Sequence, residues 1–104
     1  MWDSYAELVR LSPAVAEAVE SVRRVVYRDG ALSGKHKRLM ALAIAVQNGC
    51  AGCTWSQTEH SLELGATTEE ILEACNVAVS IGGTMAQGNA LRVVEYLKEL
   101  GKLD

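Results

Sequence analysis

An uninterrupted apolar run at residues 39–46 is the feature that most limits how this chain can fold. With 3.6 residues per helical turn, the run places apolar side chains on almost every side of one helix. Such a helix must be covered on several sides, so we expect it at the middle of the fold or in a subunit interface. The run is far shorter than the roughly 20 residues that a membrane-spanning helix needs.

The composition favours a small helical protein. The chain has 104 residues, 49% of them apolar, with no Phe and one Pro. This length suits one domain over residues 1–104, although it is on the small side for a self-sufficient core, so oligomerisation is plausible. The net charge is −3, with acidic and basic residues mixed along the chain. We therefore expect neither a nucleic acid nor a membrane as a partner.

Caps and apolar periodicity predict the helices. Ser12 and Pro13 begin one that ends before residues 28–30, and Ser33 begins a second that reaches about residue 48. A third runs from 50 to 64, and a capping box at 67–70 begins a fourth with an apolar stripe. Glycines at 82 and 83 separate it from a last helix ending near 101. No alternating strand pattern is present, so the prediction is an all-α fold of about five to six helices.

The chain has three cysteines, and two of them form a CxxC motif, Cys50 and Cys53. The N-terminus lacks the basic-then-apolar order of a signal peptide, so we expect a cytoplasmic protein. In that reducing compartment a CxxC indicates redox or metal chemistry, or two incidental small core residues, more than a structural disulfide.

The predicted third helix gives the CxxC a reactive setting. Cys50 lies at its N-terminal boundary and Cys53 one turn inside, so both sulfurs face one side near free backbone N–H groups. These groups favour the thiolate, which is the reactive form. Gln57 and His60 continue the same face. Trp55 beside it is either the wall of a substrate cleft or simple packing.

A zinc site is the competing interpretation of the cysteines. Cys50, Cys53 and Cys75 with His60 or His36 could supply four ligands. Structural zinc sites usually draw on two paired motifs, however, and no second pair is present. Cys75 also falls on the apolar stripe of the predicted fourth helix, which favours a buried, inert thiol. We therefore expect no metal and no cofactor.

Three stretches together resemble the carboxymuconolactone decarboxylase / alkyl hydroperoxidase D (AhpD-like) family. They are residues 37–53, which lead into the CxxC, then 63–71 and 82–90, and the resemblance spans about residues 14–100. It implies an all-helical domain that assembles into trimers or hexamers. The CxxC places the chain on the hydroperoxidase side, which implies an antioxidant thiol peroxidase reduced by a lipoyl-type or thioredoxin-type dithiol protein. The family pattern points to Cys53 as the peroxidatic cysteine and to Cys50 as the more exposed partner in reduction.

Two positions depart from the family's proton relay. A Glu is expected twelve residues before the first cysteine and a His four after the second, and here these positions hold Arg38 and Gln57. Neither replaces the relay, because Gln cannot take a proton and Arg stays charged. Arg38 could instead favour the thiolate by its charge, and His60 could connect through Gln57 or a water. Both also have ordinary interpretations, as a surface ion-pair residue and a solvated histidine.

The leading hypothesis is therefore a thiol-dependent peroxidase or disulfide reductase. The candidate site residues are Cys50, Cys53, His60, Gln57 and Arg38. One alternative is a decarboxylase-like enzyme of small organic acids, in which Arg38 binds a carboxylate. Another is a non-catalytic, redox-sensing oligomer in which the altered relay has removed turnover.

Overall fold

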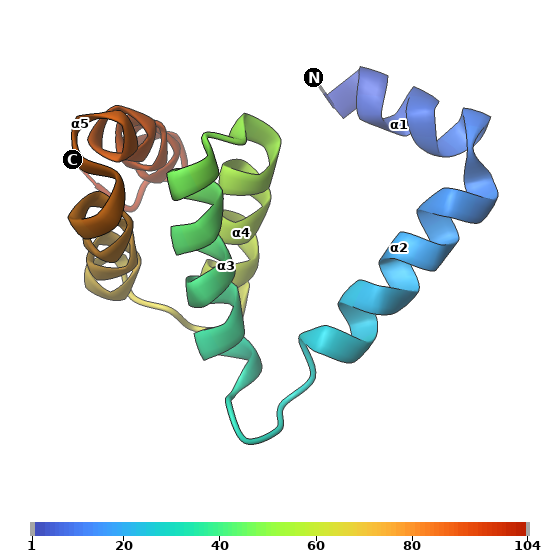
Figure 1. Ribbon diagram of the computed structural model, residues 1–104, viewed down its shortest axis with the longest axis horizontal. Coiled ribbons are helices and arrows are strands. Elements are labelled where there is room, and N and C mark those ends of the chain that lie inside the picture. Colours follow the sequence, from blue (N-terminus) through green and yellow to red (C-terminus); the bar gives the residue numbers. More distant parts are fainter. Residues whose placement is uncertain (1, 104) are drawn as a thin grey trace.

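The computed structural model describes residues 2–103, and this part of the chain is built from helices and connecting loops (Figure 1). The helices are α1 (Trp2–Leu11), α2 (Pro13–Val26), α3 (Gly34–Asn48), α4 (Ala51–Glu63) and α5 (Thr68–Glu99). The prediction of an all-α fold is confirmed. None of these helices is both long enough and apolar enough to cross a membrane.

Local capping fixes most helix ends where the sequence predicts them. The Ser33 hydroxyl accepts the N–H of His36 at 3.1 Å at the start of α3. Thr67 and Glu70 form the predicted capping box at the start of α5, with hydrogen bonds of 3.1 and 2.9 Å. Ser12 does precede α2, but its side chain makes no capping hydrogen bond, so that part of the prediction is wrong.

Helix α1 is not among the helices that the sequence predicts. This helix has Asp3 in its first turn and Arg10 in its last, which complements the helix dipole, and Arg10 also pairs with Glu7. Its packing partner is α2 alone. A short helix with one apolar face and one neighbour gives a weak signal in the sequence, and this is why it was missed.

The two helices predicted on either side of residues 82–83 form one long helix, α5, with a kink. Gly83 has φ 59° and ψ −139°, a backbone conformation that is strongly disfavoured for every residue other than glycine. The predicted interruption is therefore a change of direction and not a loop.

Helices α3, α4 and α5 pack together, with α3 contacting both of the others (Figure 1). The core is apolar and consists mainly of Leu42, Val46, Ile71, Cys75, Ala78, Ala86, Val93 and Leu97. The apolar run of α3 is thus central to this three-helix body, as predicted. Its outer side chains stay uncovered, because Met40 is 51% exposed and Ile44 60% exposed.

Helices α1 and α2 form an arm that stands apart from the three-helix body (Figure 1). The loop after α2 anchors it: the Asp29 carboxylate accepts the Gly34 N–H at 2.6 Å, and Lys37 Nζ donates to the Val26 and Arg28 carbonyls at 2.9 and 2.6 Å. Gly34 is required here, since a Cβ would lie 2.7 Å from the Tyr27 carbonyl oxygen. The loop after α2 is therefore tied to the start of α3.

Candidate active site

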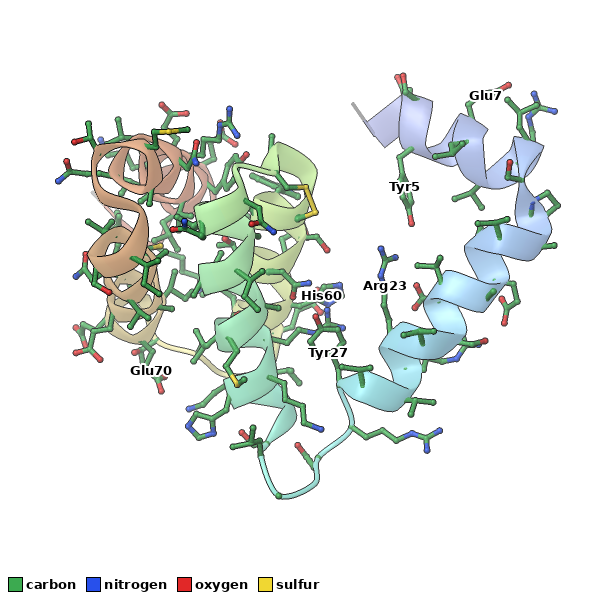
Figure 2. The ribbon with its side chains drawn as sticks, viewed as in Figure 1. Tyr5, Glu7, Arg23, Tyr27, His60 and Glu70 are labelled. Atoms are coloured by element: carbon green, nitrogen blue, oxygen red, sulfur yellow. A yellow bond between two sulfur atoms is a disulfide. The ribbon has the colours of Figure 1, made fainter. Side chains whose placement is uncertain are left out.

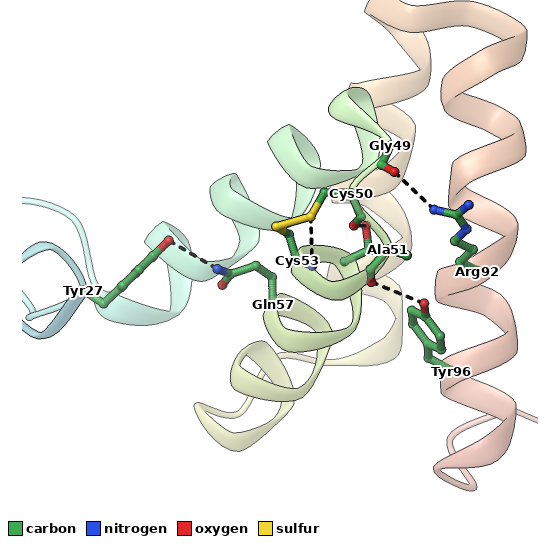
Figure 3. The surroundings of a disulfide bond; sticks show 9 residues. Tyr27, Gly49, Cys50, Ala51, Cys53, Gln57, Arg92 and Tyr96 are labelled. Atoms are coloured by element: carbon green, nitrogen blue, oxygen red, sulfur yellow. Dashed lines mark hydrogen bonds between the residues drawn. A yellow bond between two sulfur atoms is a disulfide. The ribbon is translucent and has the colours of Figure 1, made fainter. Parts of the chain in front are cut away.

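The two CxxC cysteines lie at the start of α4 and form a disulfide (Figure 3). Cys50 is the N-cap residue, with an extended backbone, and Cys53 is in the first turn. Their Cα atoms are 5.3 Å apart. The prediction that both sulfurs share one side of a helix N-terminus is confirmed.

The two sulfurs have different surroundings. Cys50 Sγ accepts the backbone N–H of Cys53 at 3.2 Å, so it receives a hydrogen bond from the helix N-terminus. Cys53 is exposed and Cys50 is half-buried. The expectation that Cys50 is the more exposed of the pair is therefore wrong. The physical reason is that Cys50 belongs to a connection held against α5, whereas Cys53 faces outward one turn later.

Three polar side chains of α5 hold that connection in place. Asn89 donates to the Val46 carbonyl at 2.9 Å. Arg92 donates to the Gly49 carbonyl at 3.3 Å and Tyr96 to the Ala51 carbonyl at 3.4 Å (Figure 3). Sequence reasoning missed all three. Their i, i+3, i+7 spacing on an otherwise apolar helix face was the available signal, because it aligns polar groups along one side of α5.

The face of α4 turned toward the core carries hydroxyl side chains. Thr54 and Thr58 are buried and donate to the Cys50 and Thr54 carbonyls at 2.7 and 2.8 Å. These bonds to the preceding turn satisfy the hydroxyls without a partner from another helix. Ser61 continues the row, and its buried hydroxyl has no hydrogen-bond partner within the described residues. Cys53 and Gln57 lie on a neighbouring face of α4, about a quarter turn from this row.

Arg38 and Gln57, at the two altered relay positions, contact each other. Arg38 Nη1 donates to Gln57 Oε1 at 3.1 Å, and the guanidinium lies 3.5 Å from the centroid of the Tyr27 ring. Gln57 in turn donates to the Tyr27 hydroxyl at 3.4 Å (Figure 3). Burial, with a smaller effect from the positive charge of Arg23, lowers the pKa of Arg38. The structure thus joins Arg38 to the cysteine-bearing helix through Gln57.

His60 lies beyond Gln57 and faces a different partner. Its Nδ1 is 3.3 Å from the Glu63 carboxylate, and within residues 2–103 no hydrogen bond joins it to Gln57 or to either sulfur. With Trp55 it lines a hollow of about 320 Å³. Trp55 also packs edge-on against Tyr96, with ring centroids 4.5 Å apart. The packing interpretation of Trp55 is thus confirmed. The lining of the hollow includes neither Cys50 nor Cys53, so a substrate cleft beside the thiols stays a prediction.

The third cysteine is separate from the pair. Cys75 is 3% exposed in the core, as predicted, and burial raises its pKa to about 11. A thiol in this position cannot reach an exposed pair at the start of α4. Among the described residues, no three His, Cys, Asp or Glu side chains gather in a group that could hold a metal ion.

Comparison with known proteins agrees with this architecture. An uncharacterised protein of Cupriavidus necator is 30% identical over 92% of this chain and 85% of its own length. A carboxymuconolactone decarboxylase family protein of Legionella pneumophila has a TM-score of 0.87 at 32% identity, covering 96% of this chain and 89% of that one. A family member from Thermotoga maritima, for which a part in an antioxidative response has been suggested, has a TM-score of 0.77 at 31% identity, covering 85% and 91%.

The model of the carboxymuconolactone decarboxylase family itself matches residues 13–96, from the start of α2 almost to the end of α5. The match includes the CxxC pair and the α5 residues that hold its connection. With these helices and this cysteine pair, the chain belongs to the carboxymuconolactone decarboxylase family.

Proposed function

We propose that this protein is a thiol-dependent peroxidase or disulfide reductase that cycles its Cys50–Cys53 pair between dithiol and disulfide. The observation that carries the proposal is the position of the pair: bonded, at a helix N-terminus, with Cys53 exposed. An exposed thiol beside backbone N–H groups is the setting in which cysteines react. The suggested antioxidative part of the Thermotoga relative supports the same chemistry.

In the proposed cycle, the surroundings of the two sulfurs support the following division of roles. The exposed Cys53 thiolate attacks a hydroperoxide oxygen, the O–O bond breaks, and the alcohol leaves with a proton, so that Cys53 becomes a sulfenic acid. The Cys50 thiolate, favoured by the Cys53 N–H at 3.2 Å, attacks Cys53 Sγ, and the S–O bond breaks; the hydroxide takes up a proton from solvent and leaves as water. A dithiol reductant then attacks Cys53, and Cys50 leaves as the stabilised thiolate.

The remaining candidate residues assist this pair in the proposal. Gln57 lies one turn after Cys53, where it orients the approaching group by hydrogen bonding, and Arg38 fixes Gln57 and supplies positive charge. His60 acts from beyond Gln57 through a water, as a source of protons for the leaving alcohol. Arg38→Ala and His60→Ala should each slow oxidation of the pair by a hydroperoxide. Unchanged rates in both variants would remove these two roles.

Cys53 is the residue whose substitution tests the proposed cycle most directly. In the reduced protein, hydrogen peroxide or cumene hydroperoxide should consume the Cys50 and Cys53 thiols together, and Cys53→Ser should abolish turnover with a dithiol reductant. Mass spectrometry of the alkylated protein counts the thiols, and consumption of hydroperoxide measures turnover. Cys75→Ser is the matched control, because that thiol is buried away from the pair.

Other outcomes separate the alternative functions. Reversible oxidation without turnover would identify the redox-sensing protein in place of the enzyme. Turnover of a small organic acid that survives serine at both Cys50 and Cys53 would identify the decarboxylase-like enzyme. Failure of every hydroperoxide to oxidise the pair would contradict the peroxidase.

The proposed working form is a homo-oligomer reduced by a dithiol protein of the lipoyl or thioredoxin type. The structural support for an oligomer is the exposed apolar surface of the α1–α2 arm and of α3. A small three-helix core buries little apolar surface, and a second copy of the chain would bury more by covering these exposed side chains.

A further inference from the structure

A hollow of about 210 Å³ lies where the end of α2 faces α3, and its lining is mostly arginine. It is formed by Glu20, Arg23, Arg24, Tyr27, Arg28 and Arg38, which we call the arginine pocket. Figure 2 shows Tyr27 projecting from this end of the arm toward the three-helix body, and Arg23 extending from α2 toward Tyr5. Four of the six arginines in a chain of net charge −3 gather here, so the pocket is a local reversal of the overall charge.

The carboxylates nearby neutralise only half of the arginine pocket. Arg23 pairs with Glu20 at 3.6 Å, and Arg24 pairs with Glu17 at 2.8 Å. Within residues 2–103 no carboxylate pairs with the other two arginines, Arg28 and Arg38. Two guanidinium groups therefore remain for an anion from outside, and their planar donors match the oxygens of a carboxylate or a phosphate.

The arginine pocket is held in shape before any ligand arrives. The Arg38 guanidinium lies over the Tyr27 ring at 3.5 Å and is tied to Gln57 at 3.1 Å. Lys37 and the contact between Asp29 and Gly34 fix the loop below it. Partial burial of Arg38 strengthens its interaction with an anion, because less water competes for the guanidinium. The Arg38 side of the pocket thus has little to reorganise on binding.

The arginine pocket adjoins the cysteine pair through one residue. Gln57 contacts Arg38 and Tyr27, and it follows Cys53 by four residues on α4, a rise of about 6 Å.

The arginine pocket also leaves the valine side chains of α2 free for another contact. Val15, Val19, Val22 and Val26 share one side of the helix, whereas Tyr27 and Arg24 lie on another.

We infer that the arginine pocket binds an anionic group, a carboxylate or a phosphate, of the molecule that exchanges electrons with Cys50 and Cys53. The inference rests on the proposed function for its redox step. When the charged group of such a molecule binds in the arginine pocket, its reacting group, several bonds away, is brought to Cys53. For a dithiol, one thiolate attacks Cys53 Sγ, the Cys50–Cys53 bond breaks and Cys50 leaves as a thiolate. The second thiolate then attacks the dithiol's first sulfur, the mixed disulfide with Cys53 breaks, and Cys53 leaves as the dithiol closes its own disulfide ring. Two electrons pass to the protein, and two protons pass from the dithiol to the protein thiols.

Dihydrolipoate and dihydrolipoamide test the inference, because they carry the same dithiol and differ in a carboxylate against a neutral amide. We expect dihydrolipoate to reduce the Cys50–Cys53 disulfide about tenfold faster, equivalent to about 1.4 kcal/mol. The protein's overall negative charge would by itself favour the amide, so a ratio above one reports a local site. In Arg28→Gln/Arg38→Gln the ratio should fall to about one. Lys98→Gln/Lys102→Gln, which removes the same two positive charges near the end of α5, should leave the ratio as in the wild type.

A ratio of one or less in the wild type, or a ratio that survives the double arginine substitution, would overturn the inference. If neither dithiol reduces the disulfide, the proposed function fails, and the arginine pocket is then judged by binding alone. Calorimetry with octanoate, octyl phosphate and octanamide gives that measurement and separates a carboxylate from a phosphate site. Binding of an anion, lost in the double variant, supports the pocket; equal or absent binding of all three overturns it.

Discussion

The buried thiol of Cys75 gives the protein a pH dependence of its own. Burial raises its pKa from 9.0 to about 11. Below pH 9 the thiol is protonated in both the folded and the unfolded chain, and its contribution to stability is fully present. Between pH 9 and 11 only the unfolded chain loses the proton, so the free energy of unfolding falls by about 2–3 kcal/mol. We expect urea titrations to show this loss in the wild type.

Cys75→Ala isolates that effect from the other groups that titrate in alkali. The variant is less stable at pH 7, because it leaves a small cavity in the core, but the difference between the two proteins should shrink by about 2–3 kcal/mol from pH 9 to 11. A difference that stays constant across this range would show that Cys75 does not titrate as a buried thiol.

At the scale of single residues, the sequence predicts what depends on neighbours in the chain. Cys50 and Cys53 are three residues apart at a helix start, so their pairing and their N-terminal setting follow from helix geometry. The contact of Arg38 with Gln57 joins two helices, and the bond from Arg92 to Gly49 joins residues 43 apart. Such contacts depend on how the helices pack, and no local pattern specifies this.

Among the elements, the kink of α5 depends on one glycine. Gly83 has φ +59°, and a Cβ there would meet nothing within 4 Å, so any cost of Gly83→Ala comes from the backbone and not from a clash. We expect this substitution to lower the free energy of unfolding by about 1–3 kcal/mol. Thermal unfolding followed by circular dichroism measures the change.

Gly88 on the same helix is the matched comparison. It is exposed, has helical backbone angles, and a Cβ there would also meet nothing within 4 Å. Gly88→Ala should therefore stabilise the protein by about 0.5–1 kcal/mol, because alanine loses less conformational freedom in a helix. Equal effects at the two positions would show that the kink does not require glycine.

The helices themselves were predictable where a cap or a glycine stop marks them, because these signals act within a turn. The starts of α3 and α5 and the end of α3 at Gly49 are of this kind. The direction of α5 after Gly83 was not predictable, since two glycines are compatible with a loop as well as with a kink. The position of the arm relative to the body was not predictable either, because it depends on loop contacts such as that of Asp29 with Gly34.

The molecule as a whole has two apolar surfaces that a single chain leaves uncovered. On the arm, Val15 is 65% exposed and Val22 is 61% exposed, and α2 has no buried residue. On the body, a groove of about 360 Å³ between α3 and α5 is lined wholly by apolar side chains. Its lining includes Met40, Ile44, Val77 and Ile81. Surfaces of this size and chemistry usually mark an interface.

If the arm and the groove are covered by further copies of the chain, the wild type should sediment as an oligomer of the 11.2 kDa subunit. Val22→Asp places a charge on the arm, and Val77→Asp places one in the groove, where the valine is 58% exposed. Neither valine is packed within its own chain, so each variant should keep its helical circular dichroism while its mass falls to that of a smaller species. A monomeric wild type would contradict the assembly. Dissociation by Val22→Asp alone would instead place the contact on the arm and leave the groove without a part in it.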